Sequence, residues 1–190
     1  KFAQTFSTDD SLPTEVSKIF KQFTSNCTVS RSMAQAQQFA DELYGAGKYT
    51  ILKSFGAGTI GETYLAKTAD GTEVVIKMLK DGVTPERFAE DRAVFIKYIS
   101  EFVSDPAEKE YKTNLINSMF DAWDKELNFG LEAQGAKDMA QGAQRFNVVQ
   151  TLEIGSRNGQ NVSLVMEKAN GVRLDNLLEM IKLYRENPTE

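Results

Sequence analysis

The sequence predicts an α+β fold, in which strands and helices occupy separate stretches of the chain. Three short β-rich runs follow one another between residues 49 and 79, and two more lie between residues 147 and 167. Glycine-containing loops or the Asn158-Gly159 turn separate the strands within each group. Strands that follow each other without an intervening helix favour an α+β fold over a parallel α/β sheet. The expected strands cover residues 49–55, 62–67, 73–79, 147–154 and 161–167.

Apolar residues that recur every three or four positions predict helices in most of the remaining chain. Pro13 suits the first turn of one helix, and Gly45 suits the end of the next. The helix that starts at Asp105-Pro106 continues towards Met139, with a break or bend expected at Gly130 or Gly135. The expected helices cover residues 13–23, 30–44, 85–102, 106–139 and 174–184.

Composition excludes several classes of function. The formal net charge is −5 and no basic stretch is present, which argues against nucleic-acid binding. The sequence contains no His, so His-based triads, His general bases and most zinc sites are excluded. No apolar run approaches the roughly 18 residues that a membrane span needs. Cys27 is the single cysteine, so we expect no internal disulfide and a reducing intracellular compartment, cytoplasmic or peripheral to a membrane, rather than secretion.

A glycine-rich loop with the spacing GxGxxG lies between the first two expected strands. This spacing alone is weak evidence, because it also suits a tight hairpin loop. A dinucleotide-binding loop would join a strand to a helix, whereas this loop joins two strands and instead suits a flap over nucleotide phosphates. Side chains at the glycine positions would hold the backbone away from such a ligand. The loop is Gly56-Ala57-Gly58-Thr59-Ile60-Gly61.

Lys77 ends the β-branched run Val74-Val75-Ile76 in the third expected strand. It either lies at a solvated edge of the sheet or reaches nucleotide phosphates and pairs with a carboxylate from a helix, because an unpaired buried lysine is costly. Glu126 and Glu132 are the candidates for that carboxylate. Small neighbours such as Ala133 and Gly135 would let the helix approach the strands closely at Glu132. Most helical glutamates are only solvated, so spacing leaves the choice open.

The last expected strand runs into a short linker that ends at Gly171. This arrangement suits either an ordinary strand leaving a sheet or the hinge strand of a kinase-like lobe, whose backbone would hydrogen-bond the edge of an adenine base.

Together these segments resemble the N-terminal lobe of the protein-kinase fold, and further motifs resemble the UbiB/ADCK family of atypical kinases. The opening KFAQTFSTDDSLP is similar to the KxGQ signature and the acidic turn of that coenzyme-Q-associated family. ELNFGLEAQGAKDM is similar to its acidic stretch and EA-containing helix. The resemblance covers essentially the whole chain. It implies a five-stranded antiparallel sheet plus helix C, with an N-terminal helical extension over residues 1–47, a kinase-like lobe over 48–171, a helical insert over about 85–125, and a connection to a second lobe over 172–190.

The resemblance also implies roles for individual residues. Lys77 would contact the phosphates with Glu132 of helix C as its partner, and Gly56 to Gly61 would cover them. Val75 would line the cofactor site, Met166 would be the gatekeeper, and Glu167 and Ala169 would form the adenine-binding hinge. Lys1 and Gln4 would belong to a KxGQ element that folds over the active site and hinders access of protein substrates. An N-terminal helix start that only packs on the lobe is the alternative for this stretch.

Three positions depart from the family pattern. The KxGQ glycine is Ala3, which narrows backbone freedom, and GAGTIG replaces an alanine-rich phosphate loop. The acidic ExD element reads Glu126-Leu127-Asn128, so its second carboxylate is missing. Glu126 and Asn128 are therefore candidate regulatory residues. Asn128 can still bind through its oxygen, but it brings no negative charge to Lys1 or to a metal.

The implied activity is ATP-dependent phosphoryl transfer or ATP hydrolysis in a longer protein, with an unidentified phosphate acceptor and a possible lipid or protein partner. The 19 residues past Gly171 contain no Asp-Phe-Gly or catalytic loop, and the chain begins at Lys1 without a leader. We therefore expect one lobe that is inactive alone, with the Mg²⁺ ligands in the missing lobe and no metal site within this chain.

Two other functions stay open at this level. One is a non-catalytic nucleotide sensor or scaffold, which the changes at Ala3 and Asn128 suggest. The other is an interaction module that docks a partner or a membrane surface through the stripe Phe88, Phe95, Ile99 and Phe102, although such a stripe is more often core.

Overall fold

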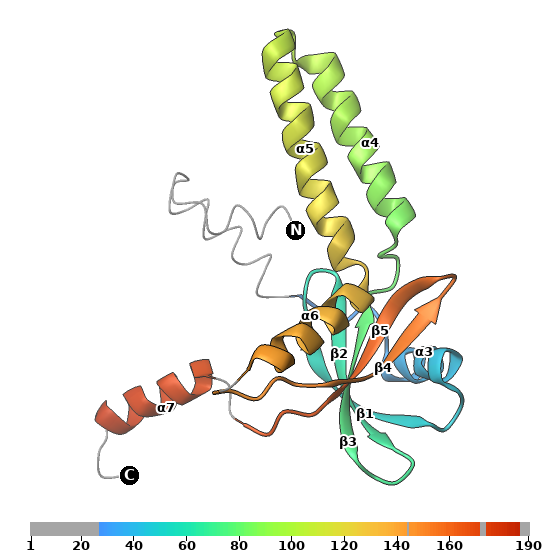
Figure 1. Cartoon of the computed structure of the whole chain (residues 1–190), viewed down its shortest axis with the longest axis vertical. Coiled ribbons are helices and arrows are strands. Elements are labelled where there is room, and N and C mark those ends of the chain that lie inside the picture. Colours follow the sequence, from blue (N-terminus) through green and yellow to red (C-terminus); the bar gives the residue numbers. More distant parts are fainter. Residues whose placement is uncertain (1–26, 144, 172–173, 187–190) are drawn as a thin grey trace.

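The computed structural model describes residues 27–143, 145–171 and 174–186, so Lys1, Gln4, Ala3 and the helix expected over residues 13–23 lie outside the described residues. Five strands form one antiparallel sheet in the order β1-β2-β3-β5-β4, which confirms the predicted α+β class (Figure 1). The strands are β1 Tyr49–Ala57, β2 Gly61–Thr68, β3 Glu73–Leu79, β4 Thr151–Arg157 and β5 Gln160–Glu167.

Two turns and one strand start show how local chemistry sets these boundaries. The β4–β5 turn holds Asn158 and Gly159 at φ 52° and 78°, and Gly71 has φ 88° in the β2–β3 turn, so the conformations suit the residues predicted there. The strand expected from residue 147 begins instead at Thr151. The Gln150 amide donates to the Glu167 side chain at 3.2 Å, and the Gln150 side chain donates to the Val148 carbonyl at 2.7 Å. These polar contacts replace the start of the strand ladder.

Helices begin where a side chain caps them. Ser32 and Gln35 form a reciprocal capping box, Thr84 and Asp105 cap helices that open with proline, and Asn128 caps the helix after them. The long helical stretch breaks at Leu127-Asn128 rather than at Gly130 or Gly135, because Asn128 adopts an extended backbone and accepts from the Gly130 amide at 3.0 Å. The helices are α3 Met33–Tyr44, α4 Pro85–Phe102, α5 Pro106–Glu126, α6 Phe129–Gly142 and α7 Leu174–Glu186.

The sheet lies between α3 on one face and α6 on the other (Figure 1). Val74, Ile76 and Met78 alternate with Lys77 along β3 and are fully or almost fully buried. Tyr64 is the register partner of Ile76, and its hydroxyl points to the Arg31 carbonyl just before α3. The apolar residues of β3 therefore face α3, and Lys77 faces α6.

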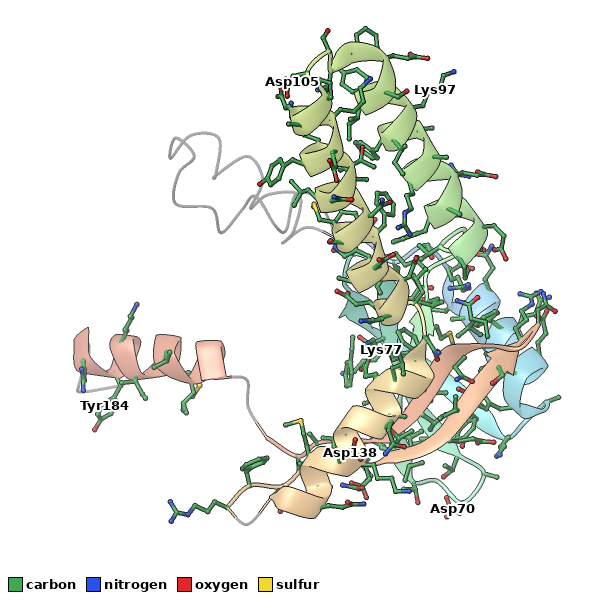
Figure 2. The ribbon with its side chains drawn as sticks, turned by 45° about the horizontal axis from the view of Figure 1, so that its top comes forward. Asp70, Lys77, Lys97, Asp105, Asp138 and Tyr184 are labelled. Atoms are coloured by element: carbon green, nitrogen blue, oxygen red, sulfur yellow. The ribbon has the colours of Figure 1, made fainter. Side chains whose placement is uncertain are left out.

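Helices α4 and α5 form a hairpin that projects away from the sheet, with Lys97 and Asp105 near its tip (Figures 1 and 2). The predicted stripe divides along it. Ile99 is buried and Phe88 is partly buried against Phe120 of α5, whereas Phe95 is 38% and Phe102 is 67% exposed. Buried and exposed positions therefore alternate along the stripe, so only part of it is hairpin core.

A buried ion pair joins the segment before α3 to the sheet. Glu62 of β2 has no exposed surface, and its carboxylate accepts from Arg31 at 2.6 Å and from the Ser30 amide at 2.6 Å. The Arg31 guanidinium also donates to the Leu79 carbonyl of β3 at 2.6 Å and lies 4.3 Å from the centre of the Phe39 ring. The end of β3, the start of β2 and the chain entering α3 are therefore held at one point.

Replacing Arg31 by Leu should lower the free energy of unfolding by about 3 kcal/mol, because Glu62 would stay buried without its partner. Urea denaturation measures this change. Arg87→Ala, at an exposed position of α4, is the matched control and should change stability by less than about 0.5 kcal/mol. An Arg31→Leu variant as stable as the control would show that the pair does not hold the fold together.

A second cluster ties the start of β1 and the residue before it to β4. Glu153 accepts from Lys48 at 2.6 Å and from the Tyr49 hydroxyl at 2.7 Å. Partial burial of Glu153 opposes ionisation, but the hydrogen bonds from Lys48 and Tyr49 outweigh it and lower the pKa of this carboxyl below 4.5.

The lowered pKa of Glu153 predicts an acid-dependent loss of stability. Because the folded-state pKa lies below the unfolded value, the contribution of Glu153 is present above about pH 4.5 and is lost as the pH falls through the folded-state pKa. Unfolding free energies measured from pH 7 to pH 3 should fall less steeply for Glu153→Gln than for the unmodified chain. Identical slopes for the two proteins would contradict this assignment.

Candidate functional site

The glycine loop connects β1 to β2 as a strand–loop–strand flap. Gly56 has φ 132°, which a residue with a side chain rarely adopts, and its carbonyl accepts from the Thr63 hydroxyl at 3.2 Å. The Gly58 amide donates to the Gly61 carbonyl at 2.8 Å and closes the loop. The carbonyl of Ile60 accepts from the Lys80 amide at 2.8 Å, so the loop is fastened to the end of β3.

Lys77 of β3 lies beneath this loop and pairs with Glu132 in the first turns of α6. The Lys77 Nζ atom is 2.7 Å and 2.5 Å from the two carboxylate oxygens of Glu132. The pair is accessible, with 26% of the Lys77 and 44% of the Glu132 side chain exposed. The structure thus pairs Lys77 with Glu132, one of the two carboxylates that spacing left open and the one that the family resemblance implies.

Helix α6 reaches Lys77 with Glu132 because α5 ends before it. Glu126 is the last residue of α5, and the turn at Leu127-Asn128 starts a new helix in which Glu132 belongs to the first turn. Phe129, at the first position of α6, is buried, and its ring centre lies 4.7 Å from Lys77 Nζ. The ring therefore makes a cation–π contact with the Lys77 ammonium group.

One pocket of about 570 Å³ contains the loop and the ion pair. It separates the tip of the glycine flap from the junction of α5 and α6, and the Glu126 and Asn128 side chains lie on its wall. The cleft is open and combines backbone amides of the loop with a partly exposed lysine that a carboxylate holds in place. This combination suits a phosphate-bearing ligand. The lining is Gly58, Thr59, Ile60, Gly61, Thr63, Lys77, Lys125, Glu126, Asn128, Leu131 and Glu132.

The residues expected at the adenine end lie further along the same strands. Val75 is the register partner of Met166, and Lys77 is the partner of Leu164, so Val75 and Met166 sit one side-chain step from the ion pair on the same face. Glu167 ends β5, and its amide donates to the Gln150 carbonyl at 3.0 Å. Ala169 follows the strand and is exposed. These four residues are not in the lining of the pocket under the loop.

Sequence reasoning missed five residues of the site. Lys125 and Leu131 line the pocket. Thr63 and Phe129 contact the loop and Lys77 as described above, and Asn161 of β5 donates to the Asn128 side chain at 3.1 Å. An aromatic residue directly after Asn128 was the available signal for Phe129. Nothing in the spacing of Asn161 singled it out.

The comparisons with known proteins follow this geometry. The family model of the ABC1 atypical kinase-like domain matches residues 48–188. The chain belongs to the ABC1 atypical kinase-like family. This match confirms the resemblance to the UbiB atypical kinases and agrees with a kinase-like N-terminal lobe built on the observed sheet.

A solved structure with a similar fold is that of a complex of Rv3197 with erythromycin from Mycobacterium tuberculosis. The TM-score is 0.59 at 16% sequence identity, and the similarity covers 94% of this chain and 46% of that chain. This ABC1-family chain therefore spans less than half the length of that protein. The search of curated proteins gives no match.

Within residues 27–143, 145–171 and 174–186, no cluster of three or more His, Cys, Asp or Glu side chains is arranged to hold a metal ion. No helix in the same ranges is long and apolar enough to cross a bilayer.

Removing the Lys77–Glu132 pair should change the stability of the fold very little. Both side chains are partly exposed, and exposed pairs contribute only about 0–1 kcal/mol. Lys77→Met and Glu132→Gln should each shift the free energy of unfolding by less than about 1 kcal/mol in urea denaturation. A loss of several kcal/mol would mean that the pair supports folding, and the accessible pair would no longer indicate a ligand site.

Proposed function

We propose that this chain is the ATP-binding lobe of a UbiB-like atypical kinase or ATPase, which carries out phosphoryl transfer or ATP hydrolysis in the complete protein. The observation that carries the proposal is the accessible Lys77–Glu132 pair under a glycine flap, in one pocket, in a member of the ABC1 family. A lysine paired with a helix carboxylate beside the flap is the arrangement that protein kinases need to hold nucleotide phosphates.

The proposal gives a role to the residues of the pocket and to those expected at the adenine end. Lys77 binds the phosphates, Glu132 orients Lys77, and the backbone of Gly56 to Gly61 covers the phosphate oxygens. Val75 and Met166 line the adenine end, and Glu167 and Ala169 present backbone groups to the base. The residues present fit a nucleotide in one further respect: Gly58 lines the pocket with no side chain to hold its backbone away from the ligand.

Mg²⁺ is the expected companion of ATP, and it would supply charge neutralisation at the phosphates. Its ligands, the catalytic loop and the phosphate acceptor, whether a small molecule, a lipid-associated partner or a protein, are proposed to belong to the complete protein and its partners. Residues 1–47, 48–171 and 172–190 remain the proposed extension, lobe and connection, with Lys1, Gln4 and Glu126 as proposed regulatory residues. A reducing compartment and a link to quinone biology remain proposals of the same kind.

A non-catalytic nucleotide sensor is the second candidate, and one observation favours it. The Asn128 oxygen, which replaces a family carboxylate, already accepts from the Gly130 amide at 3.0 Å and from the Asn161 side chain at 3.1 Å. An oxygen occupied in this way is a poor ligand for a metal ion or for Lys1. Nucleotide binding without turnover by the complete protein would support this candidate.

Lys77→Ala should abolish MgATP binding and turnover in the full-length protein, because the variant loses the lysine that pairs with Glu132 in the pocket under the flap. Lys77→Arg should also remove activity while folding is kept, because a guanidinium does not fit the place of a compact ammonium. Calorimetric titration with MgATP and phosphate release measure the two effects.

Lys67→Ala is the control for this experiment, because Lys67 is an exposed lysine of the same sheet and lies outside the pocket lining. It should bind and turn over MgATP as the unmodified protein does. Full turnover by Lys77→Ala would overturn the proposed function, and binding without turnover by the unmodified protein would select the sensor.

A further inference from the structure

The start of strand β5 holds both partners of the Lys77–Glu132 pair. On one side, the buried Ser163 hydroxyl donates to the Lys77 carbonyl at 2.8 Å and fixes the backbone of β3 at the lysine. On the other, the Gln160 side chain donates to the Leu127 carbonyl at 3.3 Å, at the junction of α5 and α6. Residues near the start of β5 therefore contact both the backbone of Lys77 and the turn that precedes α6, the helix that carries Glu132.

Asn161 of the same strand forms a third link. Its side-chain amide donates to Asn128 Oδ1 at 3.1 Å, and its own oxygen accepts from the Ser156 hydroxyl of β4 at 2.7 Å. Asn128 Oδ1 accepts at the same time from the Gly130 amide at 3.0 Å, which is the capping bond of α6. The first turn of α6 is thus fastened through two amide side chains to the β4–β5 hairpin.

Gly130 makes this link possible. A Cβ atom at residue 130 would collide with Asn161 Nδ2 and would lie 3.3 Å from Asn161 Cγ and 3.0 Å from Asn128 Oδ1. The Asn161 amide therefore lies against the helix backbone in the space that a side chain would occupy. Gly135, later in the same helix, has open space around the corresponding position.

We propose that Asn161 is a positioning residue that sets the orientation of α6, and through it the contact of Glu132 with Lys77, a role that rests on the proposed nucleotide function. Glu132 follows the Asn128 cap by about one helical turn, so a rotation of the first turn moves its carboxylate directly. Asn161 acts on the nucleotide only through Glu132.

The test measures MgATP affinity of the full-length protein and the ¹⁵N resonance of the Lys77 ammonium group. Asn161→Ala and Gly130→Ala should each weaken MgATP binding by about fivefold, the effect of one lost hydrogen bond. Gly135→Ala, a matched glycine substitution in the same helix, should bind normally. Gly130→Ala should weaken binding no further in an Asn161→Ala background, because the colliding amide is then absent.

Two results separate positioning from general support of the fold. Asn161→Ala should have no further effect on affinity when Glu132 is already replaced by Gln, and it should move the Lys77 resonance in the same direction as Glu132→Gln. An equal loss of affinity in the Glu132→Gln background, or an Asn161→Ala variant that binds normally, would overturn the proposal.

The ammonium resonance separates this proposal from the nucleotide proposal. If the unmodified protein does not bind MgATP, the proposed function fails, and the resonance alone decides on Asn161. A Lys77 resonance that changes in Asn161→Ala and Gly130→Ala but not in Gly135→Ala would support positioning, and an unchanged resonance would exclude it.

Discussion

The buried carboxylate of Glu62 is the constraint on which the arrangement of the lobe depends. It follows the last glycine of the flap directly, and a charge without exposed surface is tolerated only when it is paired and hydrogen-bonded. Arg31 and Ser30 supply these contacts, so the chain that enters α3 must lie against the root of the flap. Because Arg31 also bonds the end of β3, the strand that carries Lys77 is held at the same point.

The two faces of the sheet have different physical characters as a result. Helix α3 closes the face on which apolar residues of β3 and β2 are buried, and the ion pair of Arg31, just before α3, with Glu62 of β2 is almost fully buried. Helix α6 covers the other face only in part and leaves the Lys77–Glu132 pair within reach of a ligand. A buried pair constrains the fold because removing one partner is costly, whereas an exposed pair contributes little stability and is available for binding.

The family match begins at residue 48, immediately before β1, whereas Arg31 and α3 lie ahead of it. Arg31 and α3, which cover one face of the sheet, therefore come from outside the matched region. The α4–α5 hairpin, in contrast, projects away from the sheet. Among the described helices and strands, α4 contacts only α5. The hairpin continues into α6 at Leu127-Asn128.

The sequence by itself determined the α+β class, the turns at Asp70-Gly71 and Asn158-Gly159, and the candidates Lys77 and Glu132, because strand alternation, turn residues and loop spacing are local properties. It placed the helix break at a glycine, while the tertiary structure placed it at Asn128, whose cap is supported from β5. Spacing left Glu126 and Glu132 open and the family resemblance named Glu132, and the tertiary structure shows Glu132 paired with Lys77. Only the tertiary structure divided the stripe of Phe88, Phe95, Ile99 and Phe102 between core and surface, and revealed Phe129 and Asn161. Periodicity records which residues share a face of one element, but the partner that this face meets depends on how distant elements pack.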